Sequence, residues 1–242
     1  MLRFVASKPK LRKLLEFTSI GGELDTIWWK YNASGITQIQ VDSSHTVAVL
    51  AVIRKSYFTE YKADEEGEVK IPLSLYNVLD KYFKEIEAIE FVAGNGTLTL
   101  HSKNESYESA LLQTEVPMAE ISIEEKEYGL VPTLKVKITG IYGIDSEEWN
   151  IKADKIRIEY GDMLKLSVSL EDGGTYTRTA KILDKRDVSG SGSVLFDGKM
   201  FKSIIEQFSG PLYLILSEGP VILSQKTSEY SISYVLAPLT SE

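Results

Sequence analysis

Hydrophobic positions recur at helical spacing in three stretches of the chain, which predicts three amphipathic helices. Ser7 and Pro9 suit the first turn of the earliest helix, over residues 7–18. Its apolar face consists of Leu11, Leu14, Leu15 and Thr18. The second helix begins at Pro72 with PLSLYNVLDKYFKE, and the third covers residues 199–208.

Most of the remaining sequence alternates apolar and polar residues or is rich in β-branched and aromatic residues, which favours strands. Gly94-Asn95-Gly96 contains an Asn-Gly pair that is typical of a hairpin turn. Residues 140–150 carry two glycines and scattered apolar residues, and they make a poor helix. The expected strands cover residues 27–31, 36–53, 88–93, 97–101, 133–138, 155–160, 163–170, 176–183, 211–216, 221–223 and 230–236.

The order of these elements repeats. Residues 69–72 before the second helix match residues 194–197 before the third, an offset of 125 (194 − 69). At that offset Leu75 falls on Met200 and Leu79 on Ile204, while Tyr31 and Tyr160 match at 129 (160 − 31). The repeat predicts an α+β chain built from two copies of helix, strands, helix, strands. Short turns between strands imply antiparallel sheets with helices on one face.

A glutamate-rich stretch, TEVPMAEISIEEKEYGLVP over residues 114–132, lies between the two copies. It shows neither the apolar spacing of a buried helix nor a turn short enough for a hairpin. Ile121 and Ile123 fall on the same side of an extended segment, which favours an ordered connector over a solvated linker. We therefore expect an N-terminal domain over residues 1–114, a connector over 115–132 and a C-terminal domain over 133–242.

Composition narrows the class of protein. The 242 residues are 43% hydrophobic and 26% charged, which is ordinary for a soluble globular protein. The sequence has no cysteine and two histidines, His45 and His101, so no cysteine–zinc site and little basis for a histidine metal site exist. We expect neither a signal peptide nor a membrane-spanning segment. The net charge of −8 argues against a surface that is basic all round, but a local basic surface remains compatible with it.

Asp42, Ser43, Ser44 and His45 include the residue types of a hydrolase triad. A triad needs three groups that converge in space, whereas neighbours on a strand point to opposite faces. A polar strand end or turn is the favoured interpretation, and a small α+β hydrolase using Ser44 and His45 stays as an alternative. Residues 189–192 share only their glycines with a phosphate-binding loop.

Basic residues gather on or beside the predicted helices of this acidic chain. A solvated helix face explains any one of them, but their repetition favours a basic surface that contacts phosphates without reading sequence. These residues are Lys10, Arg12, Lys13, Lys81, Lys84, Lys199 and Lys202.

Four motifs, in this order on a duplicated chain, resemble the PCNA-type sliding clamps of archaea and eukaryotes. They are LRKLL at 11–15, VDSSH at 41–45, the glutamate-rich run of the connector up to Glu127-Tyr128, and YVLAP at 234–238. The resemblance covers essentially the whole length. It implies a ring of three chains, with helices lining the hole and antiparallel sheets outside.

The resemblance implies a DNA processivity factor without catalytic residues, cofactor or metal, which acts in replication and repair. It would encircle duplex DNA and hold DNA polymerase, flap nuclease, DNA ligase and a clamp loader through short peptide motifs. Its location would be cytoplasmic in an archaeon and nuclear in a eukaryote. The partner pocket would use Val41, Ser44, His45, Ile121, Ile123, Pro220, Tyr234, Ala237 and Pro238. Contact between subunits would use Tyr107, Ala110, Leu112, Tyr176, Arg178 and Ile182.

Two departures from the family pattern bear on assembly. The resemblance places a further lining helix at about residues 139–150, but that segment carries Asp145, Glu147 and Glu148 in place of basic residues. The second helix carries Asn77 and Asp80 where lysine is common. A homotrimer and a ring containing paralogues both stay open, with a slight preference for the second. A heteromeric or checkpoint-type clamp that does not close a ring alone is the alternative function.

Overall fold

The computed structural model of the chain describes residues 1–83, 88–113, 121–133, 137–169 and 173–239. These residues fold into two compact units. The first takes in the described residues of Met1–Gln40, Val49–Ala119 and Thr227–Ser231, and the second those of Val41–Ala48, Glu120–Lys226 and Ile232–Glu242. No helix within the described ranges has the length and apolar character needed to cross a membrane.

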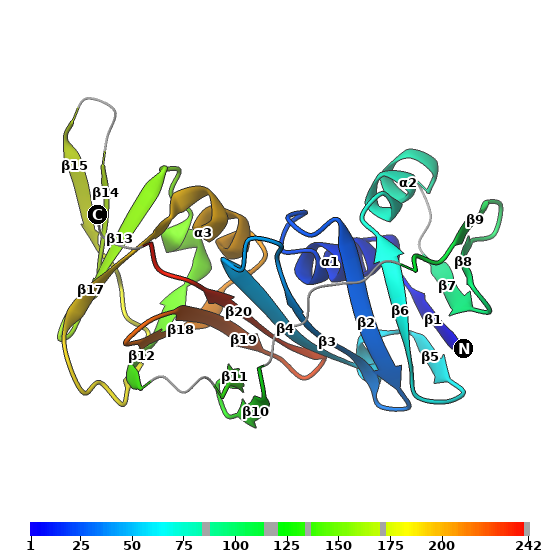
Figure 1. Cartoon of the computed structure of the whole chain (residues 1–242), viewed down its shortest axis with the longest axis horizontal. Helices are drawn as coiled ribbons and strands as arrows, with labels where there is room; N and C mark the ends of the chain where they lie inside the picture. Colours follow the sequence, from blue (N-terminus) through cyan, green and yellow to red (C-terminus); the bar gives the residue numbers. More distant parts are fainter. Residues whose placement is uncertain (84–87, 114–120, 134–136, 170–172, 240–242) are drawn as a thin grey trace. The chain divides into compact units, whose positions relative to one another are not determined.

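The N-terminal half of the chain forms two groups of antiparallel strands (Figure 1). One is a five-stranded sheet in the order β5 (Glu60–Ala63), β1 (Leu2–Ala6), β7 (Ile89–Gly94), β8 (Thr97–His101) and β9 (Ser106–Ala110). The other runs in the order β4 (Val47–Arg54), β3 (Gly35–Val41), β2 (Thr26–Asn32) and β6 (Gly67–Pro72). The helical segments of this half are α1 (Lys8–Thr18), α2 (Leu75–Tyr82) and the 3₁₀ turn η1 (Lys55–Tyr57).

The C-terminal half repeats that order strand for strand, which confirms the predicted duplication. Its five strands are β16 (Asp184–Arg186), β12 (Ile138–Asp145), β18 (Pro211–Ser217), β19 (Val221–Lys226) and β20 (Tyr230–Leu236). Its four strands are β15 (Thr175–Thr179), β14 (Lys165–Ser169), β13 (Lys155–Tyr160) and β17 (Gly192–Asp197). The remaining elements are η2 (Ser146–Trp149), α3 (Gly198–Ile205), and the hairpin of β10 (Ile123–Lys126) and β11 (Gly129–Pro132).

One pairing shows how closely the halves correspond. Tyr31 lies opposite Gly67 on the β2–β6 ladder, and Tyr160 lies opposite Gly192 on the β13–β17 ladder. A Cβ atom added to either glycine would meet the tyrosine hydroxyl at 2.5 Å. The ring therefore fills the space that the glycine leaves empty, a known way of stabilising glycine in a strand.

The helices form where capping residues and apolar faces coincide. The Ser7 hydroxyl accepts the Lys10 amide at the start of α1, and the Asp197 carboxylate accepts the Met200 amide (2.8 Å) at the start of α3. In the first unit the core packs Phe4 on Phe91, with ring centroids 4.5 Å apart. In the second unit Phe201 of α3 packs on Trp149 of η2, with centroids 6.2 Å apart. Burial of apolar side chains, these rings among them, is the main stabilising term in each unit.

Two expectations were wrong. The segment 139–150 is not a helix, because β12 occupies Ile138–Asp145 and only the short turn η2 follows. Gly143 lets β12 approach β16 closely, since an added Cβ would lie 3.1 Å from the Asp184 amide nitrogen. The connector does contain a hairpin, in which Ile123 pairs with Pro132 and Lys126 with Gly129. Part of the connector, residues 114–120, lies outside the described ranges, so the proposed domain boundaries stay a prediction.

Candidate partner-binding site

The loop between β3 and β4 is organised around the carboxylate of Asp42. That carboxylate accepts the amides of Thr46 (2.7 Å) and Val47 (2.8 Å), and the hydroxyls of Thr46 (2.9 Å) and Ser44. Burial alone would raise the pKa of Asp42, but these hydrogen bonds outweigh burial and hold its pKa below the usual value. The loop is thus fixed around the Asp42 carboxylate, although residues 43–46 are themselves exposed.

The hydrolase hypothesis is not supported by this loop. A triad places a histidine between the serine and the acid, whereas here the Ser44 hydroxyl donates directly to Asp42 and lies 3.1 Å from the Thr46 hydroxyl. His45 has a φ of 58° and is exposed, and within the described residues no hydrogen bond joins it to Ser44. Asp42 and Ser44 shape a turn.

The β10–β11 hairpin is held down by two buried serines of the β19–β20 pair. Ser224 donates to the Tyr128 carbonyl (3.1 Å), and Ser233 donates to the Leu130 carbonyl and lies 2.8 Å from the Ser224 hydroxyl. Both serines are fully buried. Buried hydroxyls need partners, and these two find them in the connector backbone. Sequence reasoning missed this role, because serine in a strand has no distinctive spacing.

Three further features fix the hairpin. Leu130 and Val131 are buried, so β11 contributes to the core of the second unit. Gly129 has a φ of +115°, and a Cβ there would lie 2.4 Å from the Ser224 hydroxyl, so only glycine fits. Lys226 pairs with Glu125 at 3.1 Å. The acidic residues of the hairpin, Glu124, Glu125 and Glu127, remain exposed.

Ile121 and Ile123 are half-buried, with exposed Ser122 between them. They therefore fall on one side of the segment, as predicted from their spacing. The Ser122 carbonyl accepts the Thr133 amide (2.8 Å), which closes the hairpin at its base. Two apolar side chains are thereby held at the margin of a hairpin that is otherwise acidic.

The tail after β20 lies against the Asp42 loop. The Ala237 amide donates to the Thr46 carbonyl at 2.8 Å, and the Leu239 amide donates to the Leu195 carbonyl at 2.8 Å. Ala237 is half-buried and Pro238 is exposed. The second unit therefore brings Val41, Ser44 and His45 together with the tail, and it anchors the connector on the strand that leads into that tail.

Two predicted members of the site differ from expectation. Tyr234 is fully buried against Phe208, with centroids 5.5 Å apart, so its side chain supports the surface from below. Pro220 lies in the turn between β18 and β19, where its carbonyl accepts the Ser217 hydroxyl at 2.6 Å. Among the described residues, no hydrogen bond links that turn to the connector hairpin or to the loop 41–48.

The basic residues of α1 are engaged with acids of the first unit. Lys10 donates to Glu229 (2.7 Å) and to the Tyr57 carbonyl (2.9 Å). Arg12 pairs with Glu16 at 3.2 Å and with Asp80 at 3.4 Å. Burial lowers the pKa of Lys13, and nearby Glu16 partly offsets this. The positive charge that the sequence predicted on this helix is largely balanced locally.

Of the other predicted phosphate contacts, Lys81 and Lys199 are exposed and Lys202 is half-buried. Lys199 lies 3.8 Å from Asp154, and Lys202 lies 3.4 Å from Glu206. Lys81 stands over the ring of Tyr82 at 5.1 Å and has no ion pair within the described ranges. Lys84 falls outside them. Among the described members of this set, Lys81 thus has the least neutralised charge.

The predicted subunit-contact residues lie at two sheet edges. Tyr107 and Ala110 are on β9, and Tyr176 and Arg178 are on β15. Each strand is the last of its sheet in the described chain. Leu112 and Ile182 lie just beyond these strands, which are shorter than expected.

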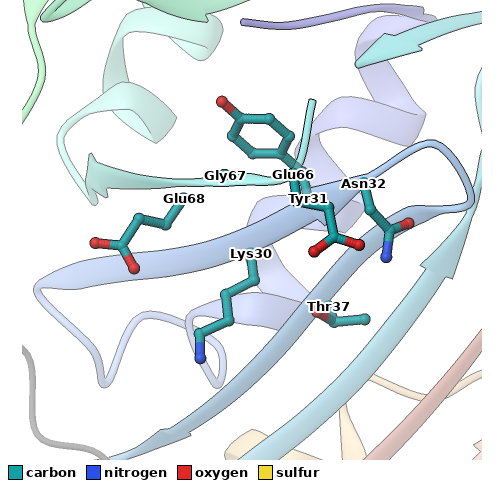
Figure 2. Close-up of a pocket in the computed structure, with 7 residues that line it drawn as sticks. All are labelled: Lys30, Tyr31, Asn32, Thr37, Glu66, Gly67 and Glu68. Carbon is teal, nitrogen blue, oxygen red and sulfur yellow. The ribbon is translucent and has the colours of Figure 1, made fainter. Parts of the chain in front are cut away.

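A separate hollow lies over β2, β3 and β6 of the first unit. Figure 2 shows the Lys30, Glu66 and Glu68 side chains on it, and its volume is about 410 Å³. Lys30 faces Glu68 across the β2–β6 ladder. None of the residues that the sequence predicted for partner binding, DNA contact or subunit contact lines this hollow.

A duplicated chain of antiparallel sheets and helices, with a connector docked beside the C-terminal tail, has the fold of a sliding clamp. The chain is similar to A. fulgidus PCNA bound to the C-terminal region of FEN-1, with 14% identity, a TM-score of 0.80 and 100% of both chains covered. It is also similar to Entamoeba histolytica PCNA, with 17% identity, a TM-score of 0.78 and 99% of both chains covered. For PCNA from Thermococcus kodakaraensis the identity is 15% and the TM-score 0.79, over 99% of this chain and 100% of that one. No protein-family model and no curated protein matches the sequence.

Proposed function

We propose that this chain is a subunit of a DNA sliding clamp that tethers partner enzymes to duplex DNA. The observation that carries the proposal is that the loop 41–48, the connector hairpin and the C-terminal tail are bonded together within the second unit. The tail bonds to the loop 41–48 through Ala237 and Thr46, and β20 bonds to the connector through Ser233 and Leu130. In the similar structure from A. fulgidus, PCNA is bound to the C-terminal region of FEN-1.

The partner surface would consist of the connector margin, the exposed loop and the tail. Ile121 and Ile123 offer apolar side chains that are only half covered, and Ala237 and Pro238 offer a second apolar edge. An aliphatic and aromatic peptide motif would bury this area at about 25 cal/mol per Å². Polymerase, flap nuclease, ligase and clamp loader would share the site through such motifs, since a few anchors dominate binding of this kind. The chain itself would perform no catalysis.

Contact with DNA would be electrostatic and independent of sequence. Among the described residues of the set, Lys81 would be the strongest single contact, because the others have acidic partners that reduce their local potential. Assembly would pair the β9 edge of one subunit with the β15 edge of the next, which removes two exposed edges.

A calorimetric titration with the C-terminal peptide of a flap nuclease tests the proposed site. We expect saturable binding of one peptide per chain with a negative heat-capacity change, because apolar surface is buried. A scrambled peptide of the same composition is the control. Equal heats for the two peptides would contradict the proposal.

A further inference from the structure

A second hollow, with a volume of about 390 Å³, lies over β13, β14 and β15 of the second unit. Along β13, Ile156 and Ile158 are fully buried, whereas Lys155 and Arg157 are exposed. Successive side chains of a strand point to opposite faces, so the hollow lies on the face of the sheet that is turned away from the core. Its polar lining includes Lys155, Arg157, Glu159, Ser167, Ser169 and Thr177, and this surface is called the β13 hollow.

Two of the lining side chains are cations that no carboxylate neutralises. Within the described residues, neither Lys155 nor Arg157 has an ion pair, although the chain has a net charge of −8. Asp197, which lies opposite Lys155 on β17, accepts the Met200 amide at 2.8 Å instead. Arg157 donates one N–H to the Ser193 hydroxyl at 3.0 Å, and the rest of its planar fork makes no hydrogen bond in the described chain.

The other side of the hollow supplies hydroxyl groups. Ser167 of β14 lies opposite Thr177 of β15, and their hydroxyl oxygens are 3.0 Å apart. Ser167 is only 8% exposed, so the sheet holds its hydroxyl in place. The pair carries two hydroxyl hydrogens, of which one joins the two oxygens, and no acceptor among the described residues takes the other. Ser169 adds a further hydroxyl two positions along β14 on the same face.

The first unit shows the same surface without these groups. At the offset of 129 that matches the two repeats along this strand, Arg157 corresponds to Trp28 (157 − 28), and in the matching β3 register Ser167 corresponds to Ile39. Trp28 is buried beneath two lysine side chains that lie over its ring, and Ile39 is half-buried. One sheet position is thus apolar in the first repeat and basic in the second, so the fold itself does not require the charge. The bases and hydroxyls of the β13 hollow call for a separate explanation, and an anionic ligand supplies one.

The donors of the hollow match a phosphomonoester. The guanidinium fork of Arg157 suits a pair of phosphate oxygens, and the Lys155 ammonium adds a second charged donor. A phosphomonoester carries a charge of about −1.5 to −2 at neutral pH and three strong acceptor oxygens. A carboxylate, or a phosphodiester of DNA, has a single charge and two free oxygens. Glu159 is the one acid among the described lining residues, and it leaves the lining with a net charge of +1 from two cations and one carboxylate.

The C-terminal tail connects the hollow with the proposed partner surface. Leu195 lines the hollow, and its carbonyl accepts the Leu239 amide at 2.8 Å. Ala237 and Pro238, which form one edge of the partner surface, directly precede that residue. The continuity of the two surfaces within one unit favours a phosphorylated peptide over free phosphate as the occupant.

We propose that the β13 hollow binds the phosphate group of a phosphoserine or phosphothreonine in a partner peptide. Arg157 and Lys155 hold two of the phosphate oxygens, and the Ser167–Thr177 pair donates to the third. The source of the peptide rests on the proposed function, whereas the phosphate site depends only on the hollow. A partner that is phosphorylated beside its clamp-binding motif would bind more tightly than the unmodified partner.

Fluorescence anisotropy with a short labelled peptide, in which alanines flank one phosphoserine, tests the phosphate site without any clamp-binding motif. We expect saturable binding of this peptide, and binding about tenfold weaker for the same peptide with serine. Inorganic phosphate in excess should displace the phosphoserine peptide at constant ionic strength. Equal affinity for the two peptides, or no displacement by phosphate, would overturn the inference.

Arg157→Gln and Lys155→Gln should each weaken binding of the phosphoserine peptide about tenfold, because each removes a charged donor. Arg157→Lys keeps the charge without the planar fork and should have an intermediate affinity. Lys152→Gln is the matched control, since it removes the same charge from an exposed position just before β13 that does not line the hollow. All three positions are exposed, so thermal melts of the variants should agree. An equal loss in Lys152→Gln, or no loss in Arg157→Gln, would also overturn the inference.

Titration with the C-terminal peptide of a flap nuclease separates this inference from the proposed function. That peptide should bind Arg157→Gln as tightly as it binds the unmodified chain, because the partner surface does not include Arg157. A chain that binds the flap nuclease peptide but not the phosphoserine peptide would keep the proposed function and lose the phosphate site.

Discussion

The amide of Ala237 donates a hydrogen bond of 2.8 Å to the carbonyl oxygen of Thr46, which lies far away in the sequence. The bond joins the tail after β20 to the loop that Asp42 organises. It explains why residues 41–48 belong to the second unit although the strands on either side of them, β3 and β4, lie mostly in the first. The proposed partner surface depends on this junction.

Ile123→Asp should weaken binding of a clamp-binding peptide by about 1–3 kcal/mol, because the peptide would bury an unpaired charge. Folding should change little, since Ile123 is only half-buried at the margin of the hairpin. Calorimetric titration and thermal melts of the same preparations measure both effects. Ser122→Asp is the control, since it adds the same charge at the exposed neighbouring position. Equal losses for the two variants would place the anchor elsewhere.

Ser233→Ala should loosen the connector hairpin at a cost of about 1–3 kcal/mol, because the buried Leu130 carbonyl loses its donor. Hydrogen exchange of residues 123–132 should accelerate more than exchange of β18, and peptide affinity should fall. Ser228→Ala is the exposed control and should leave both unchanged. Unaltered exchange in the hairpin would show that the serine does not hold it.

The lowered pKa of Asp42 predicts that acid destabilises the loop 41–48. Its folded pKa lies below the unfolded value of about 3.9, so the carboxylate contributes stability that is complete above that value. That contribution disappears as the pH falls from about 3.9 through the folded pKa. Asp42→Asn should therefore be less stable at neutral pH and show a flatter loss of stability at acidic pH. Denaturant unfolding at several pH values checks this, and parallel curves for the two proteins would contradict it.

Joint replacement of Arg12, Lys13 and Lys81 by alanine should weaken retention on DNA equally for any sequence. Without Arg12, the Glu16 and Asp80 carboxylates also lose an ion-pair partner, and their negative charge would repel the phosphates. The slope of log K against log salt should fall by about 0.9 for each phosphate that is no longer neutralised. Binding measured at several salt concentrations on two unrelated duplexes tests this, with Lys62→Ala as the control. A sequence-dependent loss would contradict phosphate contact.

Ala110→Pro should block self-association and leave the melting temperature almost unchanged, because the Ala110 amide faces the open edge. Ser109→Pro is the matched control at the adjacent position, whose amide faces β8. It should instead lower the melting temperature. Sedimentation and thermal melts distinguish the two, and an intact oligomer in Ala110→Pro would exclude β9 as the contact strand.

Local patterns predicted the helices well because the chemistry that defines them is local. The apolar stripes of α1 and α3 coincide with capping residues. The helix predicted to begin at Pro72 starts only at Leu75, because β6 extends through Pro72, and Ser74 makes no side-chain capping bond there. The match of residues 69–72 to 194–197 falls on β6 and β17. The two isoleucines of the connector were recognised for the same reason. Their side-by-side placement follows from extended geometry alone.

The errors arose where distant residues decide the outcome. The β10–β11 hairpin depends on Gly129 fitting against Ser224, which no pattern within the connector reveals. Residues 138–145 form a strand because β16 and β18 both pair with them. The acids that balance α1 include Glu229, which comes from the opposite end of the sequence. Tertiary partners override local preference in each case.

Retention on circular DNA distinguishes a closed clamp from a protein that binds DNA by charge alone. The chain is loaded with a clamp loader onto a nicked plasmid, isolated by gel filtration, and followed after the plasmid is cut once. We expect the protein to stay on the circle in high salt and to leave when the DNA is made linear, because a ring is held by topology. Protein that leaves the circle in high salt, or that stays on the cut DNA with free ends, would contradict a sliding clamp.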